Sequence, residues 1–469
     1  MKSEFFQNKS VYILLFGIFI CLISPNLLSE GMFMDGTIYA TLGRNLAEGL
    51  GTFWNPHFSL THFDEFHEHP PLAFAFLSIF YLIFGDHLII EKLYSFSTIL
   101  IQAMIIHWIW KEIQEDKNSW LAILLWLFTP IIIWTSTNNM LENSLMIFCS
   151  LSVLNYLYYL RKGQFIYLLL SGLMLSMGFL VKGPVALFPL TFPFFNAIFL
   201  QKENFLIAIK KSFFLGIIAI LPLILIYQFS TLAHESLDKY YNKQIVRSLS
   251  EIVTVKNRFQ ILVFAAKELV PSIIILLIFY FQRKRPILNI QSESFSHLKT
   301  FIACGLTGVV PIMISLKQSN FYLIPSTVFF SIGLALLFSM ILKLNPNGIS
   351  IYKNLQLPIS LFVLSIGIFL CVMNKNRISR DQTKIRAIKE IISIIPKNTI
   401  LQTCSENRYD YSLEAYFARY HKVCFDDKNQ HEFILSSAIC KNFELPNYAQ
   451  QRNISSTEFQ LYQVLQTVH

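Results

Sequence analysis

The fold is decided by a polar loop near the start of the chain, which begins with residues 35–39 (DGTIY) and ends with residues 68–72 (EHPPL). The apolar segments on either side of it, 11–28 and 88–110, are each long enough to cross a lipid bilayer. A loop that only joined two such helices would not need many ionisable groups beside the hydrocarbon, where charges are costly. Those in this loop include Asp35, Asp64, Glu65, Glu68, His57, His62, His67 and His69. The loop is therefore predicted to form the floor of an active site.

Composition indicates that the chain is a membrane protein. Of its 469 residues, 54% are hydrophobic and only 14% are charged, and the mean hydropathy is +0.49. Soluble domains carry roughly 25% charged residues, so the sequence predicts an integral membrane protein. The formal net charge of +9 is interpreted as an excess of Lys and Arg in cytoplasmic loops. Basic stripes interleaved with aromatic side chains do not occur in the sequence, so no binding to nucleic acid is expected.

Apolar runs bounded by charged residues predict an α-helical polytopic membrane protein with about 11 transmembrane helices. The runs are 11–28, 87–110, 120–135, 143–160, 165–181, 184–200, 212–229, 268–282, 300–316, 321–343 and 354–374. Basic clusters such as Arg161-Lys162, Lys210-Lys211 and residues 283–285 (RKR) fall in alternate connections, as the positive-inside rule requires. The first run is interpreted as an uncleaved helix rather than a signal peptide, because it is too long. The transmembrane domain is expected to comprise residues 1–374.

Residues 71–84 are apolar but too short for an ordinary span, and Gly85-Asp86 end them. A crossing here would move every later basic cluster to the other side of the membrane. We therefore expect a juxtamembrane helix at 71–84, which follows an external loop at 30–71. The same external face should hold residues 135–143, 230–267 and 317–320 and the C-terminal tail. This face is periplasmic if the protein lies in a bacterial inner (plasma) membrane.

Residues 375–469 are predicted to form a small extracytoplasmic α/β domain. Short apolar strands are expected at 399–403, 422–425 and 432–435, and helices at 385–395 and 413–420. Three cysteines, Cys404, Cys424 and Cys440, lie in this tail. Because an external compartment is oxidising, Cys404–Cys424 is the first candidate for a disulfide. The absence of any disulfide is an equally good expectation.

Two acids are candidates for catalysis. Asp35 follows the first span, with Tyr39 one helical turn further on and Arg44 beyond it. Glu142 lies at the junction of two spans on the same face, at a depth where an acid is expensive and usually functional. The alternative for each is a structural role as the N-cap of a helix.

Two lysines are candidates for binding a phosphate. Lys182, in residues 181–184 (VKGP), interrupts the apolar stretch 165–200, and a turn exposed on the active face would explain its charge. The alternative is a lysine that snorkels to the interface. Lys317, with Asn320 and Tyr322, lies in a corresponding turn and could add a second phosphate contact.

The histidines at 57–69 have no regular metal-ligand spacing. A divalent cation held there with Glu68 as one ligand is possible chemistry, but hydrogen-bonded loop histidines are the better expectation. The sequence also has no glycine-rich nucleotide-binding loop. An activated substrate should therefore be lipid-linked.

Together these motifs resemble the polytopic GT-C glycosyltransferases that use polyprenyl-phosphate sugars, among them protein O-mannosyltransferases and aminoarabinose transferases that modify lipid A. Residues 35–39 are similar to the acidic motif of the first external loop in that family, and residues 68–72 to its Glu-Lys-Pro-Pro-Leu element. Glu142, the Lys-Gly turn at 182–183 and residues 317–325 match in order. The resemblance covers roughly residues 10–345. Two positions depart from the pattern: Gly36 replaces a second acid, and His69 replaces the lysine before Pro-Pro.

The resemblance implies transfer of a sugar from a polyprenyl-phosphate donor to a lipid, glycan or protein acceptor, with inversion at the anomeric carbon. Asp35 would be the general base and Glu142 would orient the acceptor or hold a cation. Lys182, His69, Lys317 and Tyr322 would contact the donor phosphate. Tyr39, Arg44, Glu68 and Asn320 would complete the site, and the 230–267 loop could close over the donor. The alternative function is a transporter or flippase of lipid-linked sugars, which should instead disperse its charges along a pore.

Overall fold

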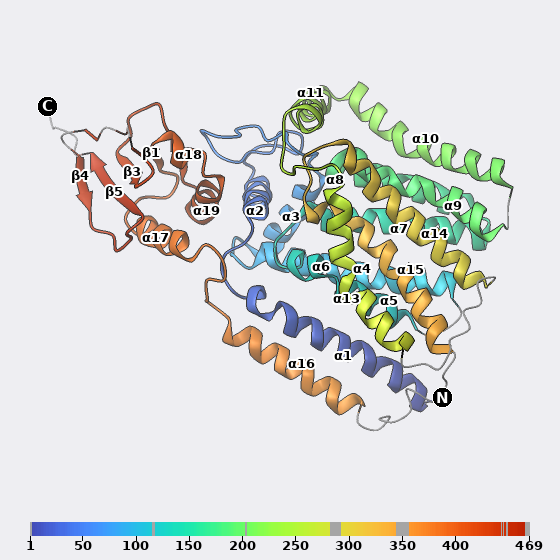
Figure 1. The fold of residues 1–469 in the computed structure, drawn as a ribbon. Helices are drawn as coiled ribbons and strands as arrows, with labels where there is room; N and C mark the ends of the chain where they lie inside the picture. The colour runs from blue at the N-terminus through green and yellow to red at the C-terminus, as the bar shows by residue number, and fades with distance from the viewer. Residues whose placement is uncertain are drawn as a thin grey trace.

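The computed structural model describes residues 2–114, 118–201, 204–281, 292–343, 356–441, 443, 445–446 and 449–464. Long helices form a bundle that carries a small α/β unit at one end, and the N-terminus lies at the opposite end of the bundle (Figure 1). The basic cluster at 283–285 and the first two residues of the last predicted span, 354–355, lie outside the described part of the chain.

The bundle consists of helices that run between its two ends. They are α1 (Lys2–Leu27), α4 (Ile90–Ile113), α5 (Ser119–Leu127), α6 (Pro130–Thr135), α7 (Leu141–Lys162), α8 (Phe165–Lys182), η1 (Gly183–Thr191), α9 (Phe192–Leu200), α10 (Phe205–Phe229), α13 (Gln260–Phe281), α14 (Glu293–Val309), α15 (Ile324–Lys343) and α16 (Gln356–Met373). Shorter elements gather at the end near the α/β unit: α2 (Met34–Ala47), α3 (Leu72–Phe84), α11 (Thr231–Tyr240), η2 (Tyr241–Val246), α12 (Arg247–Ser250), η3 (Val310–Ile314) and η4 (Asn320–Leu323).

Nine helical segments of the described chain are long and apolar enough to cross a membrane. One of them, Phe165–Leu200, is a run of 36 residues. It is divided at Gly183, which has a positive φ, and η1 after this glycine packs against α8. The predicted span 120–135 is the pair α5 and α6, separated at Pro130, and each is too short to qualify alone. With these two adjustments the helices account for the eleven predicted spans, and the polytopic fold class is confirmed. The predicted start at 268 was wrong by about two turns, since α13 begins at Gln260.

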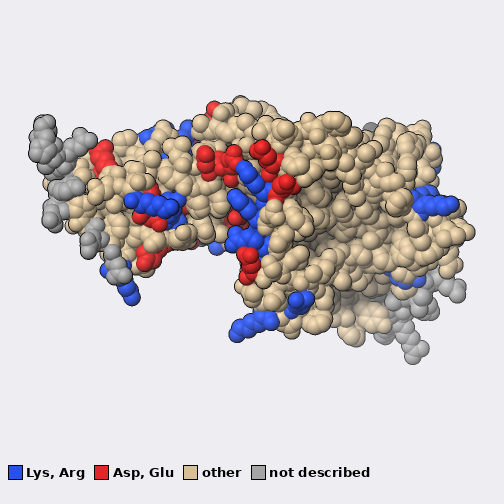
Figure 2. All heavy atoms as spheres, turned by 90° about the horizontal axis from the view of Figure 1, so that it is seen from above, with Lys and Arg blue, Asp and Glu red and all other residues tan. Residues whose placement is uncertain are grey.

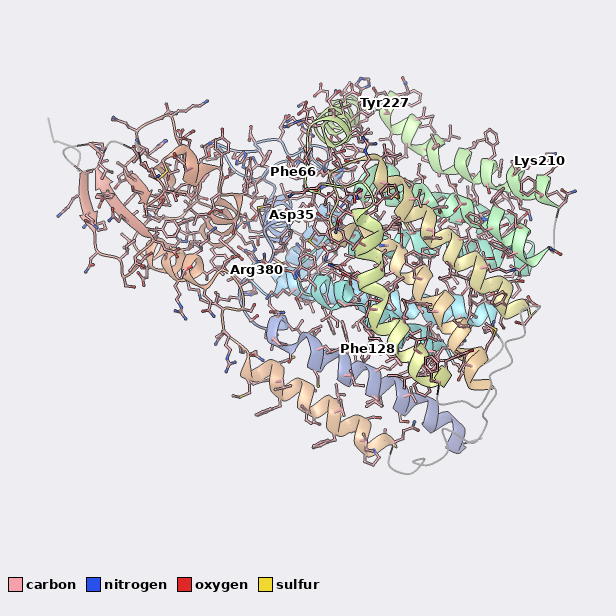
Figure 3. The ribbon with its side chains drawn as sticks, viewed as in Figure 1. Asp35, Phe66, Phe128, Lys210, Tyr227 and Arg380 are labelled. Carbon is pink, nitrogen blue, oxygen red and sulfur yellow. A yellow bond between two sulfur atoms is a disulfide. The ribbon has the colours of Figure 1, made fainter. Side chains whose placement is uncertain are left out.

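Charged side chains are distributed as a membrane protein requires. Seen from above, they gather on the α/β unit and where it meets the bundle, while the visible side of the bundle is almost bare of charge (Figure 2). Basic side chains reappear at the far end, where Lys210 lies (Figures 2 and 3). The chain is a multi-pass membrane protein, and the two ends of its helical bundle differ in the charged side chains they carry.

The C-terminal unit is built around a five-stranded sheet in the order β2-β1-β3-β5-β4. Strand β1 is parallel to β2 and β3, whereas β5 is antiparallel to β3 and β4. Its core includes Leu401, Phe417, Phe425 and Leu435. The elements are α17 (Gln382–Ile392), β1 (Ile400–Thr403), α18 (Ser405–Arg408), α19 (Tyr411–His421), β2 (Cys424–Asp426), β3 (Phe433–Ser437), β4 (Ala449–Arg452) and β5 (Phe459–Val464). The three predicted strands and both predicted helices are present.

The predicted cysteine pairing was wrong. Cys404 is bonded to Cys440, 36 residues later, and Cys424 is a buried free thiol. Cys424 lies in β2, next to β1 in the sheet, where it acts as a small apolar core residue. Cys404 follows β1 and Cys440 follows β3, so the ends of two neighbouring parallel strands bring these sulfurs together.

The sheet unit is attached to the bundle through buried arginines on both sides. Arg44 of α2 donates to the carbonyl oxygens of Ala418 and Arg419 in α19 at 3.1 and 3.0 Å. The Arg419 guanidinium in turn lies 2.7 Å from the Asp86 carboxylate and 3.1 Å from that of Glu91. Arg44 and Arg419 are each only 2% exposed, so both guanidinium groups of the junction are buried. These contacts fix the position of α2.

Candidate active site

Four connections between helices meet at the end of the bundle beside the sheet unit, as the sequence predicted. The amide of Phe33 donates to Asn138 Oδ1 at 2.8 Å, which joins the first two of these connections. His67 lies 3.1 Å from Ser236, and Thr254 donates to the carbonyl of Gln318 at 2.9 Å. These bonds link connections that are far apart in the sequence, so the four connections share one end of the bundle as predicted.

Glu142 and Lys182 form the ion pair at the centre of this region. Glu142 lies in the first turn of α7 and Lys182 in the last turn of α8. The two helices pack as a hairpin, so the N-terminus of one lies beside the C-terminus of the other. The helix dipoles favour an acid at the first position and a cation at the second. The side chains are 1% and 12% exposed, and the second carboxylate oxygen of Glu142 is buried without a hydrogen-bond partner in the described structure.

The structural alternatives for these two residues are not supported. The N-cap of α7 is Met140 rather than Glu142, and the acid is the second residue of the helix. Lys182 does not reach away along the helix surface, because its ammonium group is paired with Glu142 and lies 4.7 Å from the ring centroid of Tyr322. A fully buried acid and a largely covered lysine thus meet at the end of the bundle beside the sheet unit.

Asp35 lies in the first turn of α2, after the N-cap Phe33, so an N-cap role is excluded for it as well. Figure 3 shows it where the bundle meets the sheet unit. Burial raises the pKa of Asp35 from 3.8 to about 6, Lys182 and Lys317 act to lower the pKa, and Glu142 and Glu68 act to raise it. The carboxyl group is therefore poised to exchange a proton near neutral pH.

Gly36 departs from the family pattern for a steric reason. A Cβ atom at this position would lie 2.0 Å from the carbonyl oxygen of Asn138. The side chain of Asn139 also donates to the Gly36 carbonyl at 3.0 Å. The tight contact between α2 and the connection before α7 leaves no room for a second acid here.

His69 lies against the ring of Tyr39, with ring centroids 5.9 Å apart. It is 8% exposed, and its Nδ1 atom has no hydrogen-bond partner in the described structure. Burial, together with the charges of Lys182 and Lys317, holds the pKa of His69 well below 6.5. The imidazole is therefore neutral at pH 7, so it does not replace the cation of a lysine at this position. Burial likewise raises the pKa of Tyr39, which stays a neutral phenol.

The ion pair lines a cavity of about 340 Å³, here called the phosphate cavity. Its polar lining includes His69, Glu142, Lys182, Tyr240, Lys317 and Tyr322. Its apolar lining includes Leu145, Val185, Phe188, Leu249, Pro311 and Ile312. The cavity thus combines two lysines with an extended apolar wall. Such a combination suits a ligand that has a phosphate at one end and hydrocarbon at the other.

Lys317 closes the second side of the phosphate cavity. Its ammonium group donates to Gln244 Oε1 at 3.1 Å, and Gln244 belongs to η2, a turn of π-helix in the 230–267 connection. Such turns are frequent at functional sites. Burial lowers the pKa of Lys317, whereas the carboxylate of Glu68 raises it. Glu68 acts on this site through its charge.

The structure adds Tyr240 and Gln244 to the residues predicted from the sequence. Tyr240 donates from its hydroxyl to the carbonyl oxygen of Lys182 at 3.2 Å. Gly183 makes this approach possible, since it has a φ of 74° and its Cβ would lie 2.0 Å from the Tyr240 oxygen. The only signal in the sequence was that the 230–267 connection is long and polar.

Five of the ten predicted site residues do not line the phosphate cavity: Asp35, Tyr39, Glu68, Arg44 and Asn320. The last two make their contacts elsewhere. Arg44 is occupied by the junction with α19, and Asn320 points toward a second cavity, where its side chain hydrogen-bonds to Glu268. In the described residues, no group of three or more His, Cys, Asp and Glu side chains is arranged to hold a metal ion, Glu68 included.

The other histidines of the loop have hydrogen-bond partners of their own. His57 lies 2.9 Å from Asp64, His62 lies 2.5 Å from Glu414 of the sheet unit, and His67 lies 3.3 Å from Glu65. These contacts match the expectation of hydrogen-bonded loop histidines.

Known proteins resemble this chain in part of its sequence and in its fold. Residues 68–227, about a third of the chain, match the family described as dolichyl-phosphate-mannose-protein mannosyltransferase. The matched segment contains His69, Glu142 and Lys182. A comparison with curated protein sequences gave no match.

Among solved structures, ArnT from Cupriavidus metallidurans bound to undecaprenyl phosphate superposes with a TM-score of 0.66 at 12% identity, covering 97% of this chain and 98% of that one. The apo state of the same protein gives 0.62 at 13% identity, with 97% of each chain covered. The apo oligosaccharyltransferase of Archaeoglobus fulgidus gives 0.50 at 11% identity, covering 90% of this chain and 62% of that one. The match in residues 68–227 and the shared fold confirm the resemblance of this chain to the polytopic GT-C glycosyltransferases.

Proposed function

We propose that the protein is an integral-membrane glycosyltransferase that moves a hexose or pentose from a polyprenyl-phosphate donor to an acceptor on the periplasmic face of a bacterial inner membrane. The acceptor would be a lipid of the lipid A type, a glycan or a protein. The observation that carries the proposal is the phosphate cavity, where the ion pair of Glu142 and Lys182 faces an apolar wall. The relative of the same fold, ArnT, was solved with undecaprenyl phosphate bound.

The cavity explains how a lipid-linked donor would be held. Lys182 and Lys317 would contact the phosphate from two sides, and the hydroxyl of Tyr322 and the neutral imidazole of His69 would donate hydrogen bonds to it. The first isoprene units would lie along the apolar wall near Leu145. Because Gln244 bonds to Lys317, the 230–267 connection would close the cavity from above the donor.

Transfer follows as a single displacement. The acceptor hydroxyl attacks the anomeric carbon while the bond from that carbon to the phosphate oxygen breaks, and polyprenyl phosphate leaves with the electron pair. The proton of the hydroxyl goes to Asp35, whose pKa of about 6 leaves it mostly ionised at pH 7. The charge that grows on the departing phosphate meets Lys182 and Lys317. The unpartnered oxygen of Glu142 would accept a hydrogen bond from the acceptor and orient it.

The arrangement of charge supports transfer over transport. Asp35, Glu142 and Lys182 act on one another electrostatically at one end of the bundle, where the pKa of Asp35 responds to both of the others. A transporter of lipid-linked sugars would be expected to place such groups near the bilayer midplane.

Asp35→Asn tests the proposal most directly. In membranes supplied with a polyprenyl-phosphate sugar, we expect the variant to lose transfer by at least about a hundredfold, the usual contribution of a general base. Asp64→Asn is the matched control, because Asp64 is an exposed acid in the same loop whose partner is His57. Full transfer by Asp35→Asn would refute the assignment.

Loss of undecaprenyl phosphate binding by Lys182→Met, with binding kept by Lys162→Met, would independently support the donor site.

A further inference from the structure

A second cavity, of about 360 Å³, lies on the other side of η4 from the phosphate cavity. The side chains that define it are Phe33, Trp134, Phe321, Asn320, Glu268 and Arg380. We call it the aromatic cavity. Its lining comes from five segments of the chain: the start of α2, α6, η4, α13 and the connection between α16 and α17.

The half-buried rings of Trp134 and Phe321 form a platform in this cavity, and the half-buried ring of Phe33 is inclined to Trp134 by 65°. The rings of Trp134 and Phe321 are stacked, with centroids 6.1 Å apart and an interplanar angle of 14°. Phe33 meets the edge of Trp134 with centroids 5.3 Å apart. Flat aromatic surfaces that stay partly open to solvent provide a face for an amphipathic ring such as a sugar.

Polar groups stand around the platform. Glu268 is only 8% exposed, and it accepts a hydrogen bond from the amide of Ile131 at 2.7 Å and another from the Asn320 side chain. Arg380 lies over the ring of Phe33, with its guanidinium carbon 5.3 Å from the centroid. The Arg380 side chain is 44% exposed and its one charged neighbour in the described structure is Asp381, at 3.6 Å. Its fork of donors is therefore accessible to an anion.

The aromatic cavity and the phosphate cavity share a wall. Phe321 and Tyr322 are consecutive in η4, and Phe321 lines the aromatic cavity whereas Tyr322 lines the phosphate cavity. Lys182 lies 5.7 Å from the Phe321 ring and 4.7 Å from the Tyr322 ring. Asp35, the proposed base, follows Phe33 by two residues in the first turn of α2. Figure 3 shows Asp35 and Arg380 at the same end of the bundle.

We propose that the aromatic cavity is the acceptor subsite and that its ligand is a saccharide carrying a phosphate or carboxylate group. The sugar ring would stack on Trp134 and Phe321, the carboxylate of Glu268 and the amide of Asn320 would bond to its hydroxyls, and Arg380 would bind the anionic group. This inference rests on the proposed function, because it assigns the second substrate of the same reaction. A peptide acceptor would not need a guanidinium above an aromatic platform, so an anionic sugar fits the lining better.

Binding of glucose 6-phosphate tests the subsite. The full-length protein in detergent is first saturated with undecaprenyl phosphate, so that the phosphate cavity is filled, and tryptophan fluorescence is then followed. We expect glucose 6-phosphate to quench the fluorescence and Trp134→Phe to remove that change, which assigns it among the six tryptophans of the chain. Arg380→Gln should weaken binding about tenfold, as loss of a hydrogen bond to a charged group does. Arg377→Gln is the matched control, since Arg377 lies in the same connection but donates to Asn374 Oδ1 at 3.1 Å.

The outcomes separate this inference from the proposed function. Equal affinity for glucose and glucose 6-phosphate, or equal binding by the Arg380 and Arg377 variants, would overturn the anionic subsite. Binding of a short Ser/Thr peptide in place of the sugar phosphate would overturn it too. In either case, undecaprenyl phosphate binding that Lys182→Met abolishes would leave the proposed function standing. In nanodiscs, competition between lipid A and glucose 6-phosphate would support the subsite with a lipid-borne acceptor. Sugar-phosphate binding without that competition would support it with a free saccharide.

Discussion

Asp35, the proposed base, is kept partly protonated by its surroundings. Because burial raises its pKa to about 6, the ionised form dominates only above that pH. We predict that the transfer rate falls about tenfold for each pH unit below 6 and levels off above it. Initial rates between pH 4.5 and 8 in one membrane preparation would measure this. A rate that is flat down to pH 5 would show that Asp35 is not the group that accepts the proton.

The same shift makes a stability prediction with a definite sign. An acid whose pKa is raised by folding favours the folded state below the unfolded value of 3.8, and this contribution is lost as pH rises through about 6. At pH 7 the buried charge is therefore unfavourable, and Asp35→Asn should stabilise the protein by about 1–3 kcal/mol while abolishing transfer. Thermal unfolding in detergent at pH 7 and pH 5 would test it, since the gain should shrink at the lower pH. A lower Tm for Asp35→Asn at pH 7 would contradict the prediction.

The pair of Glu142 and Lys182 predicts a non-additive result. Lys182→Met would leave a carboxylate buried without its cation, so we expect a loss of about 3–5 kcal/mol of stability. The double variant Glu142→Gln/Lys182→Met should recover most of that stability and still fail to bind undecaprenyl phosphate. A double-mutant cycle on Tm measures the change in stability, and binding of undecaprenyl phosphate to the same variants measures the effect on the donor site. Recovery of binding in the double variant would mean that Lys182 serves only to pair Glu142.

Gly183 supports a prediction about how elements meet, and the chain supplies its own control. Gly163 and Gly183 each come directly after a helix, and their φ angles are positive, at 69° and 74°. A Cβ at Gly163 would meet nothing within 4 Å, whereas one at Gly183 would lie 2.0 Å from the Tyr240 oxygen. Gly163→Ala should therefore cost only about 1 kcal/mol of backbone strain. Gly183→Ala should cost more and also weaken donor binding, because α11 must move. Equal effects on lipid binding would argue against the contact.

The junction between the bundle and the sheet unit supports the prediction that concerns the whole molecule. Arg419 is 2% exposed and lies between Asp86 and Glu91. Arg419→Leu should leave Glu91 buried without its partner and cost about 3–5 kcal/mol. Arg386→Leu in α17 is a suitable control, because Arg386 lies at the edge of an open cavity instead. Proteolysis should release the sheet unit from the first variant and not from the second. An intact junction in Arg419→Leu would show that apolar contacts suffice.

Much of this molecule could be predicted from its sequence, for clear physical reasons. Charge at the edge of hydrocarbon is expensive, which singled out Asp35, Glu142 and Lys182 in the sequence. The alternation of basic clusters predicted that the four connections share one end of the bundle. The pairing of Glu142 with Lys182 was not predictable from the sequence. The two residues are 40 positions apart, and they meet only because α7 packs against α8. The role of Arg44 was misjudged because its partners are carbonyl oxygens of a distant helix. Strands β4 and β5 were missed, and β4 (AQQR) has no apolar alternation.

The division of the chain at residue 374 stays a prediction. A separate apolar core within the sheet unit supports it, and the helix α16 ends at Met373.

The hydrogen bonds from Arg44 to α19 join positions 374 and 375 residues apart. The ribosome makes α2 before α19. The hydrogen bonds of Arg44 to α19 therefore cannot form while the rest of the chain is being synthesised and inserted. The helix that carries Asp35 therefore gains this anchor only after the C-terminal unit has been made and has folded. We expect prematurely terminated or incompletely exported chains to be catalytically silent, even when all their membrane helices are in place. The order of the polypeptide thus makes complete biosynthesis a condition for activity.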